Sequence, residues 1–441
     1  MSTVELTSTT PAAVAAGQPG WIRDMRIEAW KSYMETPLPE KNDILWKHTD
    51  PGLFLYPVRD GLCHNENGEA ADTKSGKELE LSDTFQREFT AGKIGGVIFN
   101  NAGRQVSSYL APDVENSGII IGDLAGFVNQ RSELVMPYLG KLVGSDFGKF
   151  EALNAAIWQN GIFIYIPKNV VIEKPIYLMT QISESSRFVG RNIVVVEENA
   201  QLNLFHAYLG GTETKSDHMV NIATETFAGR ASHFNHLIVQ NLNRGSRYYF
   251  THRTQVEHDA QTLAAFASLG AGITKANVGA ILTGRGAQCD LKGFIGGHKR
   301  QHFDHFTLQD HRAPYTFSNN DFKVMVDGRA RSAFRGRIRI KSDAPHSEAY
   351  QENKNMLLSE KARVESTPEL EINQDEVKCS HGATIGPPDE SQMFYLKSRG
   401  ISDEEAIRLI VEGFMEASIR QVNGKLRDSL RNYVISNLQE N

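Results

Sequence analysis

Long apolar runs and paired cysteines are both missing from this 441-residue chain. No stretch approaches about 18 uninterrupted apolar residues, so we expect no membrane-spanning helix. The only cysteines, Cys63, Cys289 and Cys379, lie far apart and form no Cys-x-x-Cys pair. An odd, scattered set argues against a disulfide framework and favours a reducing, cytoplasmic location. It also argues against a four-cysteine zinc or iron–sulfur site made by this chain alone.

Several signatures of enzymes and nucleic-acid binders are absent as well. The chain has no GxxxxGK[ST] loop, so we expect no nucleotide binding or hydrolysis of its own. It has no HExxH, no GxSxG and no distinctive pair of carboxylates for glycoside chemistry. A net charge of −6 argues against nucleic acid as the main partner. With 40% apolar and 23% charged residues, the composition is that of a soluble globular protein.

The N-terminal third is predicted to be helical or mixed. Residues 1–20 are small and polar without a basic segment before an apolar core, so we expect a disordered tail rather than a secretory signal. A helix is predicted over residues 21–35, and Pro37 and Pro39 end it. Its apolar residues at near-helical spacing are Ile22, Met25, Ile27, Trp30 and Met34. Residues 122–158 are predicted to be helical again, which makes 21–158 one helical or mixed region.

Residues 159–386 have a different texture, with short runs that alternate apolar and polar side chains. Glycine, asparagine or aspartate separates the runs at fairly regular spacing. This rhythm is typical of an all-β solenoid, sandwich or large barrel. We favour a parallel β-helix, because the runs are not joined by the regular Asn-Gly and Asp-Gly hairpin turns of an antiparallel meander. No strict short repeat supports this choice further.

From residue 387 to residue 441 the sequence predicts helices again. Asp389 with Gln392, and Ser402 with Glu405, are capping boxes that begin two helices, and Gly400 suits the end of the first. A last amphipathic helix is predicted over about 421–438. One face of the second helix gathers apolar residues at i, i+3, i+4 and i+7: Ile407, Ile410, Val411 and Phe414.

The most suggestive chemical motif is EVKCSHGATIG, residues 376–386. In a strand, Cys379 and His381 point to the same face with Cα atoms roughly 6.5–7 Å apart. A thiol beside an imidazole could bind a transition metal or a sulfur species. The alternative is a core thiol beside a structural histidine, and the residues alone leave both open.

The densest histidine run, HKRQHFDHFTLQDH, contains His298, His302, His305 and His311. A metal site is conceivable, but His302 and His305 differ by three and face opposite ways on a regular strand. We therefore favour polar residues stacked on successive strands and bonded to neighbouring backbone. Cys289 lies in a β run and is expected to be a small buried hydrophobe, and Cys63 is expected to be incidental.

Longer blocks of the chain resemble the SufD family, the scaffold subunits of the Suf machinery for iron–sulfur cluster assembly. The blocks are QENKNMLLSEKARVESTPELEI, DEVKCSHGATIG, DESQMFYLKSRGIS and EEAIRLIVEGF, together with the upstream DFGKFEALNAAIWQNGIFIYIPKNVVIEKPI and WKSYMETPLPEKNDILWKHTD. The resemblance implies a right-handed parallel β-helix with helices at both ends. It also implies a heterodimer with the paralogue SufB through the β-helices, and docking of the ATPase SufC on the C-terminal helices.

The same resemblance implies which residues matter. SufB-like chains have His-Glu-Ala-Thr where this chain has His381–Gly382–Ala383–Thr384, and they have an upstream cysteine that residues 352–356 lack. The chain therefore resembles SufD rather than SufB. In that family the histidine of Cys-Ser-His-Gly serves a cluster-assembly site at the SufB interface. This implies that His381, with Cys379 of the same motif, contacts a transient iron–sulfur cluster shared with the partner.

Three functions follow as hypotheses. The first is a non-catalytic scaffold subunit for iron–sulfur cluster assembly. The second is a structural adaptor that holds SufB and SufC without touching iron or sulfur. The third is a carbohydrate-active β-helix enzyme, although such enzymes normally act outside the cell. A homodimer is a further possibility, since paralogous β-helices present similar surfaces.

Overall fold

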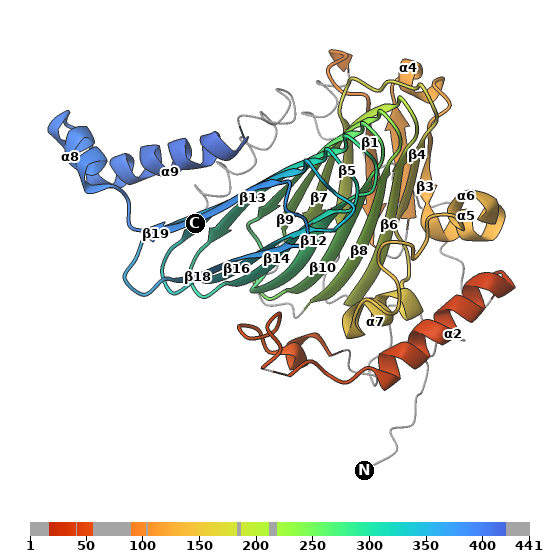
Figure 1. Ribbon diagram of the computed structural model, residues 1–441, viewed down its shortest axis with the longest axis horizontal. Helices are drawn as coiled ribbons and strands as arrows, with labels where there is room; N and C mark the ends of the chain where they lie inside the picture. Colours follow the sequence, from red (N-terminus) through yellow and green to blue (C-terminus); the bar gives the residue numbers. More distant parts are fainter. Residues whose placement is uncertain are drawn as a thin grey trace, which may run out of the picture.

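The core of the protein is a flattened parallel β-helix with helices at both ends (Figure 1). It is seen in a computed structural model that describes residues 17–40, 42–55, 90–102, 105–182, 187–210 and 218–419. From β4 onward, successive strands alternate between two sheets, and each strand pairs with the strand two further along the chain. The mainly-β prediction of a parallel β-helix flanked by helices is confirmed.

The two sheets contain ten and nine strands. In the order of the chain, the ten-stranded sheet contains β1 (Gly96–Asn101), β2 (Gln105–Leu110), β5 (Ile176–Gln181), β7 (Gln201–Leu209), β9 (His233–Asn241), β11 (Gln261–Ser268), β13 (Gln288–Gly297), β15 (Phe317–Val326), β17 (Glu348–Leu357) and β19 (Lys378–Gly386). The nine-stranded sheet contains β3 (Ile120–Asp123), β4 (Ile162–Ile166), β6 (Arg187–Val196), β8 (Met219–Ala228), β10 (Arg247–Val256), β12 (Ile273–Leu282), β14 (His302–His311), β16 (Arg331–Ile340) and β18 (Arg363–Ile372). Only β1–β2 and β3–β4 pair antiparallel, and both pairs lie at the N-terminal end.

The turns between the sheets explain why the sequence has no strict repeat. At one corner of successive coils a residue adopts positive φ: Asn199, Ala231, Asp259, Gly286, Tyr315 and His346. Asparagine, aspartate and glycine suit this conformation, but alanine and tyrosine mark no turn in a sequence. The coils also differ in length, since Gln261 pairs with Gln288, 27 positions on, whereas Gln201 pairs with His233, 32 positions on. Stacking depends on register between neighbouring strands and not on a fixed period.

Most of the N-terminal helices cover the outer face of the nine-stranded sheet. The helices are α2 (Gly20–Glu35), the 3₁₀ helix η1 (Pro51–Phe54), α4 (Pro112–Glu115), α5 (Leu124–Gln130), α6 (Ser132–Val135) and α7 (Lys149–Ile157). The short helix α4 differs, since its Val114 belongs to the apolar cluster that contains Ile98 and Ile162. Helices α2 and α7 lie side by side against the early strands (Figure 1). Further along the sheet, Thr49 donates a hydrogen bond to Asp304 Oδ2 at 2.5 Å, and Lys275 Nζ lies 2.8 Å from the same oxygen.

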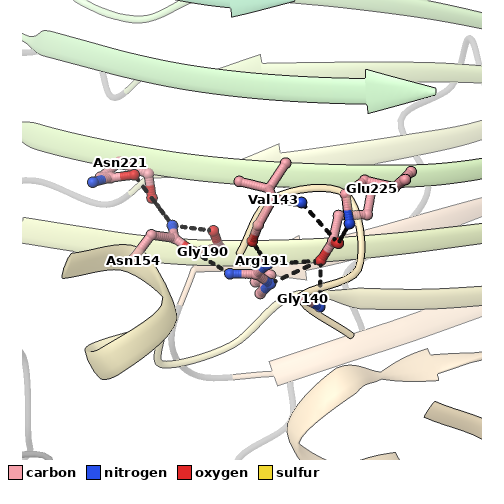
Figure 2. A network of polar contacts seen from close by, with 8 residues as sticks. Gly140, Val143, Asn154, Gly190, Arg191, Asn221 and Glu225 are labelled. Atoms are coloured by element: carbon pink, nitrogen blue, oxygen red, sulfur yellow. Dashed lines mark hydrogen bonds and ion pairs between the residues drawn. The ribbon is translucent and has the colours of Figure 1, made fainter. Parts of the chain in front are cut away.

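A buried ion pair fastens the loop after α6 to this sheet (Figure 2). Arg191 Nη2 lies 2.7 Å from Glu225 Oε1, and both side chains are fully buried. The Glu225 carboxylate also accepts hydrogen bonds from three backbone N–H groups, those of Gly140, Leu142 and Val143. Arg191 donates in turn to the Val143 carbonyl. Because every charge has partners, this pair fixes where the loop sits, whereas losing one partner would leave an uncompensated buried charge.

The C-terminal helices differ in how they contact the β-helix. Helix α9 (Asp403–Ile419) packs its predicted face, Ile407, Ile410, Val411 and Phe414, on the outer face of the ten-stranded sheet against Phe294 and Met325. Helix α8 (Glu390–Ser398) buries none of its residues and extends beyond the sheet (Figure 1). Both predicted caps are present, since Asp389 accepts from the Ser391 and Gln392 N–H groups and Ser402 accepts from that of Glu405.

Inside the coils, aromatic and aliphatic side chains alternate with buried polar ones. Phe322 and Phe334 pack across the lumen with ring centroids 5.2 Å apart. The rings of His206 and His236 are stacked with centroids 6.1 Å apart, and the His252 ring is tilted against that of His236 at 5.6 Å. Burial lowers the pKa of His206 and His252, and it lowers that of His236 to about 3. The lumen thus holds neutral histidines far from water.

Some details of the sequence predictions need correction. The α2 face towards the core consists of Ile22, Arg26, Ala29 and Tyr33, whereas Ile27 and Met34 are exposed. Arg26 is tolerated there because it donates to the Ala156 carbonyl and stacks over the Trp158 ring. Strands β1, β2 and β3 lie upstream of residue 159, where no strand was predicted. The tail up to residue 16, Cys63 and the helix expected at about 421–438 lie outside the described residues. Nowhere in the described ranges is a helix long and apolar enough to cross a membrane.

We predict that acid destabilises the fold through its buried histidines. An unfolded histidine titrates near 6.5, so below that pH the unfolded chain binds protons that the folded lumen excludes. Stability is therefore full above pH 6.5 and is lost as the pH falls towards the folded value, about 3 for His236. The loss is roughly 1.4 kcal/mol per pH unit for each such histidine. Urea unfolding between about pH 7.5 and about pH 5 measures this slope.

Two variants of strand β9 are compared: His236→Leu replaces its buried histidine, and His233→Leu replaces its exposed one. The first should flatten the dependence of the unfolding free energy on pH by the share of one histidine. The second should leave the slope as in the wild type. Equal slopes in all three proteins would contradict the assignment.

Candidate functional site: the open end of the β-helix

The Cys379–His381 motif lies in β19, the last strand of the ten-stranded sheet. Strand β18 holds the same terminal position in the other sheet, so both sheets end at one end of the β-helix. Within the described residues, β19 pairs only with β17, and β18 pairs only with β16. Each strand therefore has one edge whose backbone groups face no further strand, the arrangement that invites pairing with another chain.

Register shows which way the motif faces. Cys379 pairs with Ala349 and His381 with Gln351, and both partners are buried in the lumen. Neighbours in register point to the same side of a parallel sheet, so Cys379 and His381 face the lumen. Cys379 is half-buried and packs on the cluster of Ile338, Ile340, Ala344 and Ala349. His381 is exposed, because no further coil covers it within the described ranges.

The chemistry of the two residues is unequal. Burial raises the pKa of the Cys379 thiol, so at neutral pH it is a protonated thiol and a poor ligand until something removes the proton. The imidazole of His381 is exposed, and imidazole is a common metal ligand in proteins. No cluster of three or more histidine, cysteine or acidic side chains suited to a metal occurs in the described part of the chain. Any metal species at this end would therefore need ligands from elsewhere.

The last coil exposes apolar side chains that earlier coils bury. Ile338 and Ile340 of β16 are fully buried, but their register partners on β18, Leu370 and Ile372, are 40% and 39% exposed. On β19, Ile385 is 48% exposed. An apolar rim around unpaired strand edges is a surface that favours contact with another protein.

In the histidine run, His302, His305 and His311 each contact neighbouring side chains, which indicates a structural role. His305 and His311 face the lumen and bond to side-chain hydroxyls, Ser268 at 3.0 Å for the first and Thr316 and Ser318 at 2.7 Å for the second. His302 faces outward and contacts Thr49 at 2.9 Å. The predicted opposite orientation of His302 and His305 is confirmed, but their partners are hydroxyls and not backbone. Cys289 is a buried core residue, as predicted.

Sequence reasoning missed the residues that shape this end. Leu370, Ile372 and Ile385 look like ordinary strand residues until the sheets are known to stop beside them. The sequence analysis also gives no role to Gln351, Asn353 and Asn355. Their spacing is visible in the sequence, because amides occupy every second position of a strand where apolar residues are expected.

The fold and this end define a β-helix protein whose last described coil has unpaired strand edges. Residues 178–414 match the family described as SUF system FeS cluster assembly, SufBD core domain. Residues 97–178 match the SufBD protein N-terminal region. The chain therefore belongs to the SufBD family of iron–sulfur cluster assembly proteins.

Relatives named as iron–sulfur cluster assembly SufBD family proteins align over most of the chain. The one from Staphylococcus haemolyticus is 25% identical over 410 residues, which cover 92% of this chain and 86% of that protein. One from Staphylococcus epidermidis is 26% identical over 412 residues with the same coverage of both chains. The family-level resemblance read from the sequence is confirmed, and the more specific assignment to SufD stays a prediction.

We predict a large difference in thiol reactivity between two cysteines. Cys289 is 1% exposed, and burial raises its pKa to about 12, whereas Cys379 is half-buried at an open end. Because the thiolate is the reactive form, iodoacetamide should alkylate Cys289 in the folded chain more than about a hundredfold more slowly than Cys379. Peptide mass spectrometry measures both rates, with unfolded chain as the control in which they converge. Equal rates in the folded chain would show that the end is closed or the core open.

Proposed function

We propose that this chain is a SufD-type scaffold subunit, non-catalytic by itself, on which a transient iron–sulfur cluster is assembled together with a SufB-like partner. The observation that carries the proposal is the exposed His381 imidazole, which faces the lumen from an unpaired edge strand. One imidazole and one protonated thiol cannot satisfy a cluster, which usually has about four ligands, mostly thiolates. A partner that covers this end would supply the missing sulfur ligands.

Pairing through the β-helix ends is supported by two features of the last coil. The edges of β18 and β19 offer backbone hydrogen-bonding groups to strands of another chain. Leu370, Ile372 and Ile385 offer apolar area that such contact would bury. The SufB-like paralogue is the proposed occupant, and a second copy of this chain is the competing one.

Helix α8 supports docking of a SufC-like ATPase on the C-terminal helices. Phe394 and Tyr395 are 75% and 58% exposed, on a helix with no residue buried against the described part of the chain. Large exposed aromatics mark protein interaction sites. An ATPase partner would also supply the nucleotide hydrolysis for which the sequence has no phosphate-binding loop. We place this assembly in the cytoplasm, without nucleic acid or membrane partners.

We predict that His381→Ala abolishes cluster formation without dissolving the complex. Removing the exposed imidazole at the open end should lower the iron and sulfide content of the co-purified complex by at least about tenfold. His233→Ala, at an exposed histidine of the same sheet, is the matched control and should retain wild-type content. Full cluster content in the His381→Ala complex would reject the scaffold proposal and favour the adaptor hypothesis.

We predict that two surface changes separate the two partners. Ile385→Glu places a charge in the apolar rim and should remove the SufB-like chain while the ATPase still co-purifies. Phe394→Ala with Tyr395→Ala should do the reverse, so each variant is the control of the other. Each lost association should weaken by more than about tenfold, the effect of losing roughly 1.4 kcal/mol at an interface. If Ile385→Glu leaves pairing intact, the end of the β-helix is not the interface.

A further inference from the structure

An unpaired hydrogen-bond acceptor lies directly beneath His381. Gln351 of β17 is in register with His381 and only 3% exposed. Its Nε2 donates to the Gly336 carbonyl across the lumen at 3.3 Å. That bond identifies the other amide atom as oxygen, and this Oε1 is buried without a hydrogen-bond partner among the described residues. A buried acceptor left unpaired destabilises the fold unless something donates to it.

Gly336 of β16, on the opposite sheet, leaves the space that the Gln351 amide occupies. A Cβ added to Gly336 would lie only 2.3 Å from Gln351 Oε1, so a larger residue there would displace the amide. The side chain therefore spans the lumen at the level just below the open coil. Its oxygen cannot turn away without losing the bond to the Gly336 carbonyl.

Among the described residues, no side chain of the coil below donates a hydrogen bond to this oxygen. Asn320, in register beneath Gln351, donates through Nδ2 to Thr307 Oγ1 at 2.7 Å. Gln309 donates through Nε2 to Ser318 Oγ at 2.6 Å. Both amides, like Gln351, donate through their nitrogen and leave a buried oxygen without a partner among the described residues. The hydroxyls of Ser332 and Ser366, on β16 and β18, are also buried and unpaired there, but the side chain in register with Gln351 on the coil above is the imidazole of His381.

A histidine that binds a metal through one ring nitrogen carries its proton on the other, and that N–H almost always donates to an oxygen. Strands in a sheet are about 4.8 Å apart, so side chains in register on β17 and β19 can reach each other. We propose that Gln351 is the positioning residue of His381: its Oε1 accepts the hydrogen bond from one ring N–H and leaves the other ring nitrogen to face the partner subunit. This inference rests on the proposed function of His381 as a ligand.

The first test uses the isolated, metal-free chain, in which cluster assembly plays no part. Ring ¹⁵N chemical shifts of His381, assigned by their loss in His381→Ala, report which nitrogen holds the proton. One tautomer should predominate in the wild type. Gln351→Met removes the acceptor at similar size and should abolish the preference, whereas Gln351→Glu keeps an acceptor and should restore it. Gln374→Glu, in the turn before β19, is the control for added charge and should change nothing.

The second test measures the iron and sulfide content of the complex with the SufB-like partner. Gln351→Met should lower it by about tenfold, the usual effect of losing a group that orients a ligand, and Gln351→Glu should retain it. Thermal unfolding of each variant checks that the coil is intact. An unchanged tautomer ratio in Gln351→Met overturns the positioning role even if His381→Ala abolishes the cluster. If instead the ratio changes but His381→Ala leaves cluster content intact, the contact stands and the proposed function fails.

Discussion

Each inner strand of this β-helix makes backbone hydrogen bonds to a strand on either side. The neighbouring coils also bury the side chains that point into the lumen. At the N-terminal end the antiparallel strands β2 and β3 terminate the sheets. At the other end β18 and β19 have a neighbour on one side only, within the described residues. The same alternation that buries Ile338 and Ile340 exposes Leu370 and Ile372 one coil later. This unfinished coil is the physical basis of the proposed partnership.

The unfinished coil also gives a reason for where the chemistry sits. Histidines deep in the lumen, such as His236, are kept neutral by burial and cannot reach a partner. His381 also faces the lumen, but it lies on the last described coil, which no further described coil covers. Its ring therefore has a defined orientation and is accessible to another protein. The buried amides of Gln351, Asn353 and Asn355 on β17 make the lumen polar just below this end. Helix α9 packs on the sheet close by, which ties α8 and its aromatic pair to the same body.

Sequence patterns predicted the local features well and the long-range ones poorly. Alternation identified the β core, and the caps at Asp389 and Ser402 fixed the starts of α8 and α9, because these signals depend on a few adjacent residues. The predicted buried face of α2 is partly wrong. Arg26 is buried because it stacks on Trp158, which lies 132 positions away in the chain. The spacing of Cys379 and His381 predicted a shared face. It could not predict that this face points into an open lumen, since that depends on register with β17.

Amide hydrogen exchange across residues 363–386 tests the central claim most directly, because it follows the backbone edges of β18 and β19 without any substitution. For the chain alone, the account predicts rapid exchange at these edges and slow exchange in inner strands such as β12 and β13. In complex with the SufB-like partner, the same amides should exchange at least about tenfold more slowly as they become paired or covered. Unchanged exchange across these two strands on complex formation would contradict the claim that a partner completes the last coil.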